Sequence, residues 1–188
     1  DAWANHCEQT CRRLGIGLRI QHADARPAPG DSPEASARSA RYRVIRRCLE
    51  PGATVLMAQH QDDQAETLLL QLFRGAGLAG LAAMPMHAEL APGYLLRPLL
   101  DLPRTALRQY AGEHALSWVE DPSNQNPKLE RNFLRHAILP SLVTHWPGIA
   151  RTLARSARHC AEAHELLNAR ARELLGAVCG AEPHALDI

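Results

Sequence analysis

The sequence has few cysteines and no paired cysteine motif. Its 188 residues contain five cysteines, an odd and scattered set without any C-x-x-C pair. Neither a disulfide framework nor a cysteine zinc site is therefore expected. A reducing cytoplasm is the compartment that this cysteine usage fits best.

Long apolar runs and targeting signals are also missing. No stretch reaches the apolar length that spans a bilayer, and no basic segment precedes a short apolar one as in a signal peptide. The chain starts at Asp1 rather than Met, inside a helical pattern. We therefore expect that the chain starts inside a longer protein and has no membrane contact.

The overall composition decides little about partners. Hydrophobic residues make up 46% of the chain, enough for one sizeable core. The formal net charge is +1, from 21 basic and 20 acidic residues. This balance argues against a uniformly basic nucleic-acid-binding surface but leaves room for local basic patches.

Helical and apolar segments alternate along the chain, which predicts an α/β fold. Pro33 at a first helical position, with Ser32 as N-cap, opens one of the expected helices. The apolar run at 53–59 is typical of a strand buried on both faces of a parallel sheet. Trp3, Trp118 and Trp146 are expected core anchors. Helices are expected at 1–15, 33–49, 62–74, 102–116 and 149–177, and strands at 18–22, 53–59, on both sides of Pro92-Gly93, and after Ser117.

Three acids interrupt the leucine-rich helix at 62–74. On a helical wheel, Asp62 and Glu66 fall within the apolar arc and Asp63 at its edge, and His60 precedes them. A helix N-terminus directly after an apolar strand is where open α/β sheets bind ligands. Capping and the helix dipole could also account for acids here, so both explanations stay open.

Arginines interrupt two other helices. Arg38 and Arg41 fall within the apolar arc of the helix at 33–49, where they could bind an anion or extend to solvent. Arg131, Asn132 and Arg135 open a helix after an Asn-rich loop, a position that favours phosphate or RNA backbone. Ordinary ion pairs with Glu130 or Asp121 are the alternative for this second group.

Two other motif matches are incomplete. "HQDD" at 60–63 could suggest a metal hydrolase, but no HExxH or second ligand cluster accompanies it. "RGAGLAGL" at 74–81 lacks the GK[ST] ending of a phosphate-binding loop and follows a helix. Its glycines are expected to end that helix and let the backbone turn.

Six stretches together resemble the tRNA(Ile)-lysidine synthases, which are similar in fold to the N-type ATP pyrophosphatases of the PP-loop superfamily. The likeness covers most of residues 1–148 in the family's order. The six stretches are "EASARSARY" (34–42), "HQDDQAET" (60–67), "RGAGLAGLAAM" (74–84), "RPLL" (97–100), "WVEDPSN" (118–124) and "RNFLRHAILP" (131–140).

This resemblance implies a Rossmann-like parallel sheet flanked by helices and followed by a helical segment. Residues 1–146 would be the C-terminal part of the catalytic domain, and 147–188 a helical linker that starts a tRNA-binding domain. The implied reaction adenylates the wobble cytidine of a CAU-anticodon tRNA(Ile) with ATP and Mg²⁺. L-lysine then replaces AMP to give lysidine, and members of the family are often homodimers.

The resemblance also assigns roles to the interrupting charges. Lysine arrives as an ammonium that must be held and deprotonated. Residues matching catalytic positions are Asp63, Glu66, Arg38 and Arg131. Residues expected to bind lysine, cytidine or ATP are His60, Asp62, Arg41, Asn132 and Arg135.

The sequence departs from the family in three places. The SGGxDS loop, which binds pyrophosphate and is expected to supply a Mg²⁺ ligand, is absent from these 188 residues, so no metal ligand is expected among them and the chain alone is expected to be inactive. Gln59 stands where the family usually has histidine, and Asn126 where it often has an acid.

Arg151, Arg155 and Arg158 form a candidate RNA-binding stripe or a solvated face.

Two competing functions remain. A tRNA base thiolase of the same superfamily would need paired cysteines, and Cys7 and Cys11 lie at C-x-x-x-C spacing away from the acids. A non-catalytic RNA- or nucleotide-binding module is the other alternative. The clustered acids argue against it, because they would repel RNA unless they served an amine or a metal.

Overall fold

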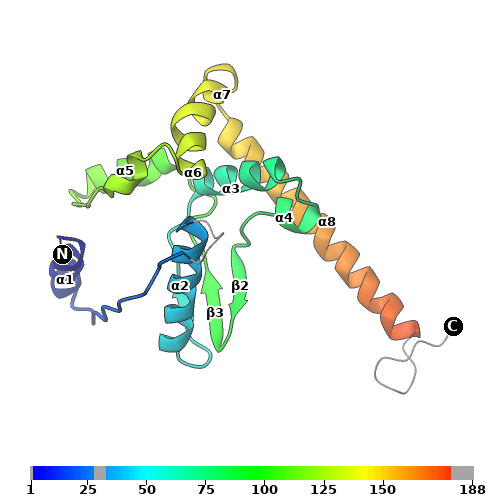
Figure 1. The fold of residues 1–188 in the computed structure, drawn as a ribbon, viewed down its shortest axis with the longest axis horizontal. Coiled ribbons are helices and arrows are strands. Elements are labelled where there is room, and N and C mark those ends of the chain that lie inside the picture. The colour runs from blue at the N-terminus through cyan, green and yellow to red at the C-terminus, as the bar shows by residue number, and fades with distance from the viewer. Residues whose placement is uncertain (1, 28–32, 179–188) are drawn as a thin grey trace.

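The computed structural model of the protein describes residues 2–27 and 33–178 (Figure 1). The Ser32 cap expected from the sequence lies outside these residues. The helices and strands, in chain order, are α1 Ala2–Leu14, α2 Pro33–Cys48, β1 Thr54–Leu56, α3 Gln61–Phe73, α4 Leu78–Leu81, β2 His87–Leu90, β3 Gly93–Leu96, α5 Arg104–Glu113, the 3-10 helix η1 Pro122–Gln125, α6 Glu130–Phe133, the π-helical turn η2 Leu134–Ile138, α7 Leu139–His145 and α8 Ile149–Val178.

The described strands form one mixed sheet in the order β1-β3-β2. β1 and β3 are parallel, as expected, whereas β2 is antiparallel to β3. The short connection between β2 and β3 allows only an antiparallel pair. The α/β class is therefore confirmed, with a sheet that is only partly parallel.

Two expected strands are not observed. Residues 18–22 and 117–121 have no regular secondary structure and are almost entirely exposed, because neither segment pairs with a described strand. β1 is present but is not buried on both faces, since it lies at the edge of the sheet and Leu56 is 66% exposed. A strand without a neighbour leaves its backbone groups to water.

One cluster of the core lies among the helices, while Leu90 and Leu95 are the buried core residues of the sheet. Leu69 of α3 packs with Leu134 and Leu139, and Leu153 of α8 covers this cluster. Burial of each such leucine stabilises the fold by about 1.5–3 kcal/mol. α8 runs past α3 and α4 and then extends away from the body of the molecule (Figure 1).

The three tryptophans do not anchor this core. Trp3, Trp118 and Trp146 are 46%, 55% and 58% exposed. They lie in α1, in the segment before η1 and directly after α7. The prediction that they are core anchors was wrong.

Buried polar contacts fix α3 relative to the chain that follows it. Gln64 donates from Nε2 to the carbonyl of Met84 at 2.9 Å, and the N–H of Met84 donates to Gln64 Oε1 at 3.0 Å. Gly75, with a φ of +68°, ends the turn after α3 as the sequence predicted. These contacts set the direction in which α3 presents its N-terminus.

The helix that carries the arginines is continuous from α6 through α7. The π-helical turn η2 precedes Pro140, which has no N–H to continue a regular helix. Arg131 and Arg135 are four residues apart and therefore share one face. That face is directed at the N-terminal half of α3.

None of the helices in the described part of the chain combines the length and the apolar character needed to cross a membrane.

The close approach of β3 to the residue before β1 predicts a glycine requirement. A Cβ on Gly93 would lie 2.1 Å from the carbonyl oxygen of Ala53, whereas one on Gly112 would meet no atom within 4 Å. Gly93→Ala should lower the free energy of unfolding by about 1–3 kcal/mol. Gly112→Ala, inside α5, should raise it by up to about 1 kcal/mol. Urea denaturation of both variants measures this, and equal effects would contradict the packing described.

Candidate active site

The N-terminus of α3 follows β1 closely and is capped by its own side chains. His60 accepts the N–H of Asp63 on Nδ1 at 3.4 Å, and Asp63 Oδ2 accepts the backbone N–H of His60 at 3.1 Å. This reciprocal capping fixes the carboxylate of Asp63 just beyond the sheet. One of the three acids therefore has a structural role in addition to any chemistry.

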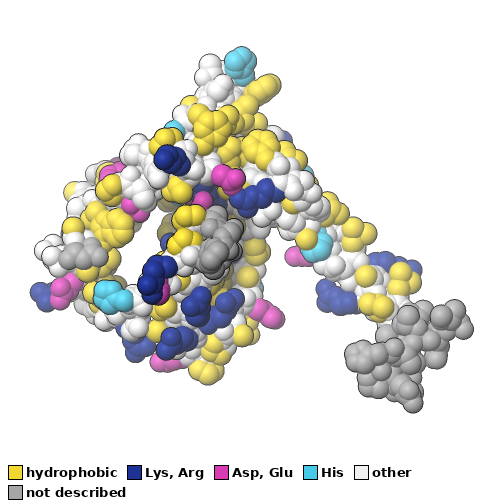
Figure 2. Space-filling model, viewed as in Figure 1, with side chains coloured by type: hydrophobic (Ala, Val, Ile, Leu, Met, Phe, Trp, Pro, Cys, Tyr) yellow, Lys and Arg dark blue, Asp and Glu magenta, His cyan; other side chains and the backbone are white. Residues whose placement is uncertain are grey.

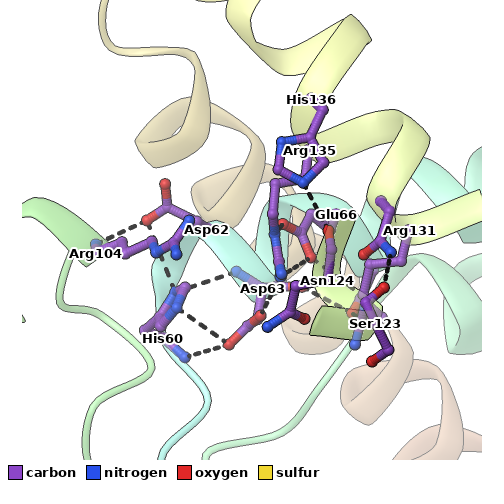
Figure 3. A network of polar contacts seen from close by, with 12 residues as sticks. His60, Asp62, Asp63, Glu66, Arg104, Ser123, Asn124, Arg131, Arg135 and His136 are labelled. Carbon is purple, nitrogen blue, oxygen red and sulfur yellow. Dashed lines mark hydrogen bonds and ion pairs between the residues drawn. The ribbon is translucent and has the colours of Figure 1, made fainter. Parts of the chain in front are cut away.

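Asp62 connects α3 to α5. Its Oδ2 accepts the backbone N–H of Arg104, the first residue of α5, at 2.8 Å (Figure 3). A carboxylate at a helix N-terminus satisfies a free N–H and complements the helix dipole. The structure thus places Asp62 as a residue that holds α5, outside the hollow described below.

Glu66 lies at the centre of the charged cluster and is 1% exposed. Arg135 donates to it from Nε to Oε1 at 2.7 Å and from Nη2 to Oε2 at 2.9 Å. The same Nη2 donates to Asp63 Oδ1 at 3.2 Å (Figure 3). One guanidinium therefore holds two carboxylates in a fixed geometry.

Arg131 is the second cation on Glu66. Its Nε lies 3.3 Å from Glu66 Oε2 but is not aligned for a hydrogen bond, and its Nη2 donates to Thr67 Oγ1 at 2.6 Å. The ion pairs with Glu130 or Asp121 that the sequence left open are not the ones observed. Glu130 pairs with Arg74, and the carboxylate of Asp121 caps η1.

Burial controls the protonation of this cluster. Burial raises the pKa of Glu66 above its ordinary value, although its hydrogen bonds and charge contacts with the arginines oppose the shift. Burial lowers the pKa of Arg135, but its contacts with Glu66, Asp63 and Asp62 outweigh that effect and raise it overall. Arg135 is therefore a permanent cation beside a carboxyl group that ionises with difficulty.

Asn132 positions the Asn-rich loop. It is 5% exposed, and its Nδ2 donates to the carbonyls of Ser123 and Asn126 at 2.8 and 2.9 Å. The side chain of Asn126 accepts the N–H of Lys128 at 3.1 Å, a role that an aspartate at this position could fill equally well. The amide nitrogen of Asn132 is thus committed to the loop rather than directed at a ligand.

A hollow of about 410 Å³ opens over the cluster. The structure brings six of the nine predicted site residues together here, since the hollow is lined by Arg41, His60, Asp63, Arg131, Asn132 and Arg135. Glu66 is not part of the lining. With Arg104 and Glu34 included, four arginines face two carboxylates, which suits an anionic ligand with an amine.

Arg38 lies apart from this group. Its guanidinium is 4.9 Å from the centre of the Tyr42 ring, and it lines a neighbouring hollow of about 460 Å³. Arg131 and Glu34 line both hollows. Arg38 and Asp63 therefore belong to adjacent compartments that meet at Arg131.

No group of three or more His, Cys, Asp or Glu side chains within 2–27 and 33–178 is arranged to hold a metal ion. The acids of "HQDD" are instead engaged by Arg104, Arg135 and backbone N–H groups. This arrangement does not support a metal hydrolase.

Sequence reasoning missed the role of Arg97 and its acceptor Gln59. Arg97 is 3% exposed and donates from Nε to Gln59 Oε1 at 3.1 Å. The sequence did contain a signal for Arg97, because this charged residue directly follows an apolar strand. It therefore lies at the same edge of the sheet as the residues after β1. The sequence alone quoted this arginine only as part of "RPLL".

Comparison with known proteins identifies the family. A model of the PP-loop domain matches residues 1–142. The chain belongs to the PP-loop domain family. The match includes α3, the Asn-rich loop and the helix with Arg131 and Arg135, so both sides of the hollow lie within the domain.

Three similar relatives each bear the name tRNA(Ile)-lysidine synthase. The protein of Methylococcus capsulatus is 53% identical over 182 residues, which are 97% of this chain and 42% of the relative. That of Pseudomonas aeruginosa is 52% identical over 167 residues, or 89% and 37%. That of Coxiella burnetii is 48% identical over 166 residues, or 88% and 37%. The chain therefore spans about two fifths of the length of these PP-loop relatives.

The buried pair predicts a large effect of removing one partner. Arg135→Met would leave the carboxyl group of Glu66 buried without its main donor and should lower the free energy of unfolding by about 3–5 kcal/mol. Arg108→Met removes an exposed partner of Glu120 and should cost about 0–1 kcal/mol. Urea denaturation at neutral pH compares the two, and similar losses would contradict the buried pairing.

The raised pKa of Glu66 predicts a pH dependence of stability. The folded protein binds this proton more tightly than the unfolded chain, so ionisation of Glu66 opposes folding. The stability of the wild type relative to Glu66→Gln should be highest below the ordinary pKa of 4.5 and fall as pH rises through the raised pKa. Denaturant unfolding of both proteins from pH 4 upward measures the difference. A relative stability that rises with pH would contradict the assignment.

Proposed function

We propose that this chain provides the lysine- and anion-binding part of an active site that converts the wobble cytidine of tRNA(Ile) to lysidine. ATP activates O2 of the cytidine by adenylation with loss of pyrophosphate, and the ε-amine of L-lysine attacks C2 and displaces AMP. The observation that carries this proposal is the hollow in which Asp63 is held by Arg135 among further arginines. The names of the relatives support the same reaction.

Asp63 is the carboxylate that faces the lysine ammonium. Its Oδ1 contacts Arg135 and its Oδ2 contacts the N–H of His60, and each oxygen retains a lone pair for an incoming N–H. Asp63 holds the amine near the reacting carbon and takes the proton that must leave before attack. His60 keeps this carboxylate in place through the cap.

Glu66 acts through the arginines. It is buried below the hollow and orients Arg131 and Arg135, so the substrate meets their guanidinium groups rather than the carboxyl group. The two cations, with Arg41, then stabilise negative charge on the phosphate and on the cytidine oxygen as it leaves. Glu66 is thus proposed as a positioning residue, and Asp62 and Asn132 as residues that hold α5 and the loop.

Arg38 serves the phosphate side of the reaction. It lines the hollow that adjoins the Asp63 compartment at Arg131. A nucleotide that spans the two hollows would place its phosphate between Arg38 and Arg131, with the base toward Asp63. This division lets one arginine, Arg131, act in both steps.

The Mg²⁺ that the family implies finds no ligand set among the described residues. No step of this proposal therefore passes through the ion.

The proposed domain division places residues 1–146 in the catalytic domain and 147–188 in a helical linker toward a tRNA-binding domain. The family match to residue 142 supports the first part. The first turns of α8 still pack on the core through Leu153 and the fully buried Ala157. The free cysteines among the described residues support a reducing compartment, which we propose is the cytoplasm.

Thiolation is the weaker candidate. The described cysteines at 7, 11, 48 and 160 are unpaired, and none of them lines the hollow over Asp63. A non-catalytic RNA-binding module gains some support from the arginines of the hollow but gives no reason for Asp63 to face into it.

Lysine transfer tests the proposal. The full-length gene product that carries these residues is incubated with ATP, Mg²⁺, labelled lysine and an unmodified tRNA(Ile) transcript with a CAU anticodon. Label should enter the tRNA only with ATP. Asp63→Asn should lower kcat/KM at least about a hundredfold, because general-base catalysis contributes about 10²–10⁴.

Glu113→Gln provides the matched control, since Glu113 is an exposed carboxylate of α5. It should transfer lysine at the wild-type rate. A folded, tRNA-binding protein that transfers no lysine would refute the function. Transfer that is undiminished in Asp63→Asn would refute the role of Asp63 alone.

A further inference from the structure

Arg97 is a buried cation outside the cluster around Glu66. It directly follows β3 and is 3% exposed. No carboxylate among the described residues forms an ion pair with it, in contrast to Arg135 and Arg131. Its charge is therefore not explained by an acidic partner in this part of the chain.

Three neutral groups bind the guanidinium. Nη1 donates to the carbonyl of Pro85 at 2.7 Å, Nε to Gln59 Oε1 at 3.1 Å, and Nη2 to Tyr42 Oη at 3.3 Å. A buried cation held only by neutral acceptors is a poor way to gain stability, since an apolar side chain of similar size would avoid its desolvation. What Arg97 provides is a fixed link between segments that are distant in sequence.

One link leads to Arg38. Tyr42 accepts from Arg97 and donates from Oη to Met57 Sδ at 3.5 Å, so two contacts fix its hydroxyl group. The guanidinium of Arg38 lies over that ring, one helical turn earlier in α2. The position of Arg38 therefore depends on where Arg97 holds Tyr42.

The other link leads to Asp63. Gln59 accepts from Arg97 and donates from Nε2 to Met57 Sδ at 3.8 Å. The next residue, His60, caps α3 and fixes the carboxylate of Asp63. The side chain of the residue before this cap is thus bound to the same guanidinium as Tyr42.

We propose that Arg97 is a positioning residue that fixes the two compartments of the site relative to each other, α2 with Arg38 on one side and the α3 cap with Asp63 on the other. Gln59 suits this role because its amide oxygen accepts at every pH, whereas a protonated histidine there could not accept. The kinetic consequences of this inference rest on the proposed function, but its structural consequence does not.

Three variants of the full-length gene product test the inference. Arg97→Lys keeps the charge but cannot present three directed N–H groups to these acceptors, so kcat/KM for lysine transfer should fall at least about tenfold. Tyr42→Phe removes one acceptor and should raise the KM for ATP roughly two- to tenfold while leaving that for lysine unchanged. Gln59→Leu should raise the KM for lysine by a similar factor and leave the KM for ATP unchanged.

Hydrogen exchange gives a readout that is independent of activity. In Arg97→Lys, the amides of Asp63 and Gln64 should exchange faster than in the wild type, whereas those of the buried part of α8 should not change. Arg170→Lys is the matched control, because Arg170 forms an exposed ion pair with Glu173 within α8.

Two results for Arg97→Lys would overturn the inference. One is faster exchange of amides throughout the protein, and the other is unchanged exchange in α3 together with unchanged kinetics of lysine transfer. If Arg97→Lys does not fold, the KM values of the other two variants test the inference. Tyr42→Phe should raise only the KM for ATP and Gln59→Leu only that for lysine. A variant that raises both KM values equally would overturn the inference. A wild-type protein that transfers no lysine would refute the proposed function, while the exchange result would still decide the role of Arg97.

Discussion

The buried carboxylate of Glu66 is the constraint on which the site depends. A carboxyl group that is 1% exposed needs donors, and Arg135 provides two hydrogen bonds to it while Arg131 adds a second charge. This requirement draws the helix that follows the Asn-rich loop onto α3. It also leaves Nη2 of Arg135 on Asp63, so the one carboxylate of this cluster that faces the hollow is oriented by the same contact.

The acids of the α3 N-terminus consequently have different roles despite their proximity (Figure 3). Asp62 holds α5, Glu66 holds the arginines, and Asp63 faces the hollow. The space-filling view shows basic side chains gathered over α2 (Figure 2), and these are arginines, since α2 contains no lysine. The region thus offers one directed carboxylate within a mainly cationic setting, which suits an amine that must react beside phosphate.

Sequence patterns predicted the helices well because their signals are local. Pro33 and the glycines after α3 each mark a helix end through backbone chemistry. Patterning also predicted that Glu66 faces the protein. It failed for the strands at 18–22 and 117–121, because strand formation depends on a partner that no local signal specifies.

The ion pairs within the site also could not be predicted from the sequence. The wheel shows that Arg131 and Arg135 share a face, but not that Glu66 rather than Glu130 lies opposite. Such contacts join residues far apart in the chain, and only the folded packing decides them. Resemblance to a family named nine candidate residues, six of which line the hollow, whereas their division into facing and positioning groups required the structure.

Equilibrium binding of L-lysine to the full-length gene product tests the central claim most directly, namely that Asp63 faces the hollow and holds an ammonium there. Calorimetry should detect lysine binding to the wild type, binding at least about tenfold weaker to Asp63→Asn, and similarly weakened binding of Nε-acetyl-lysine, which lacks the charge. Equal binding of lysine and its acetylated form, or unchanged binding to Asp63→Asn, would contradict the account.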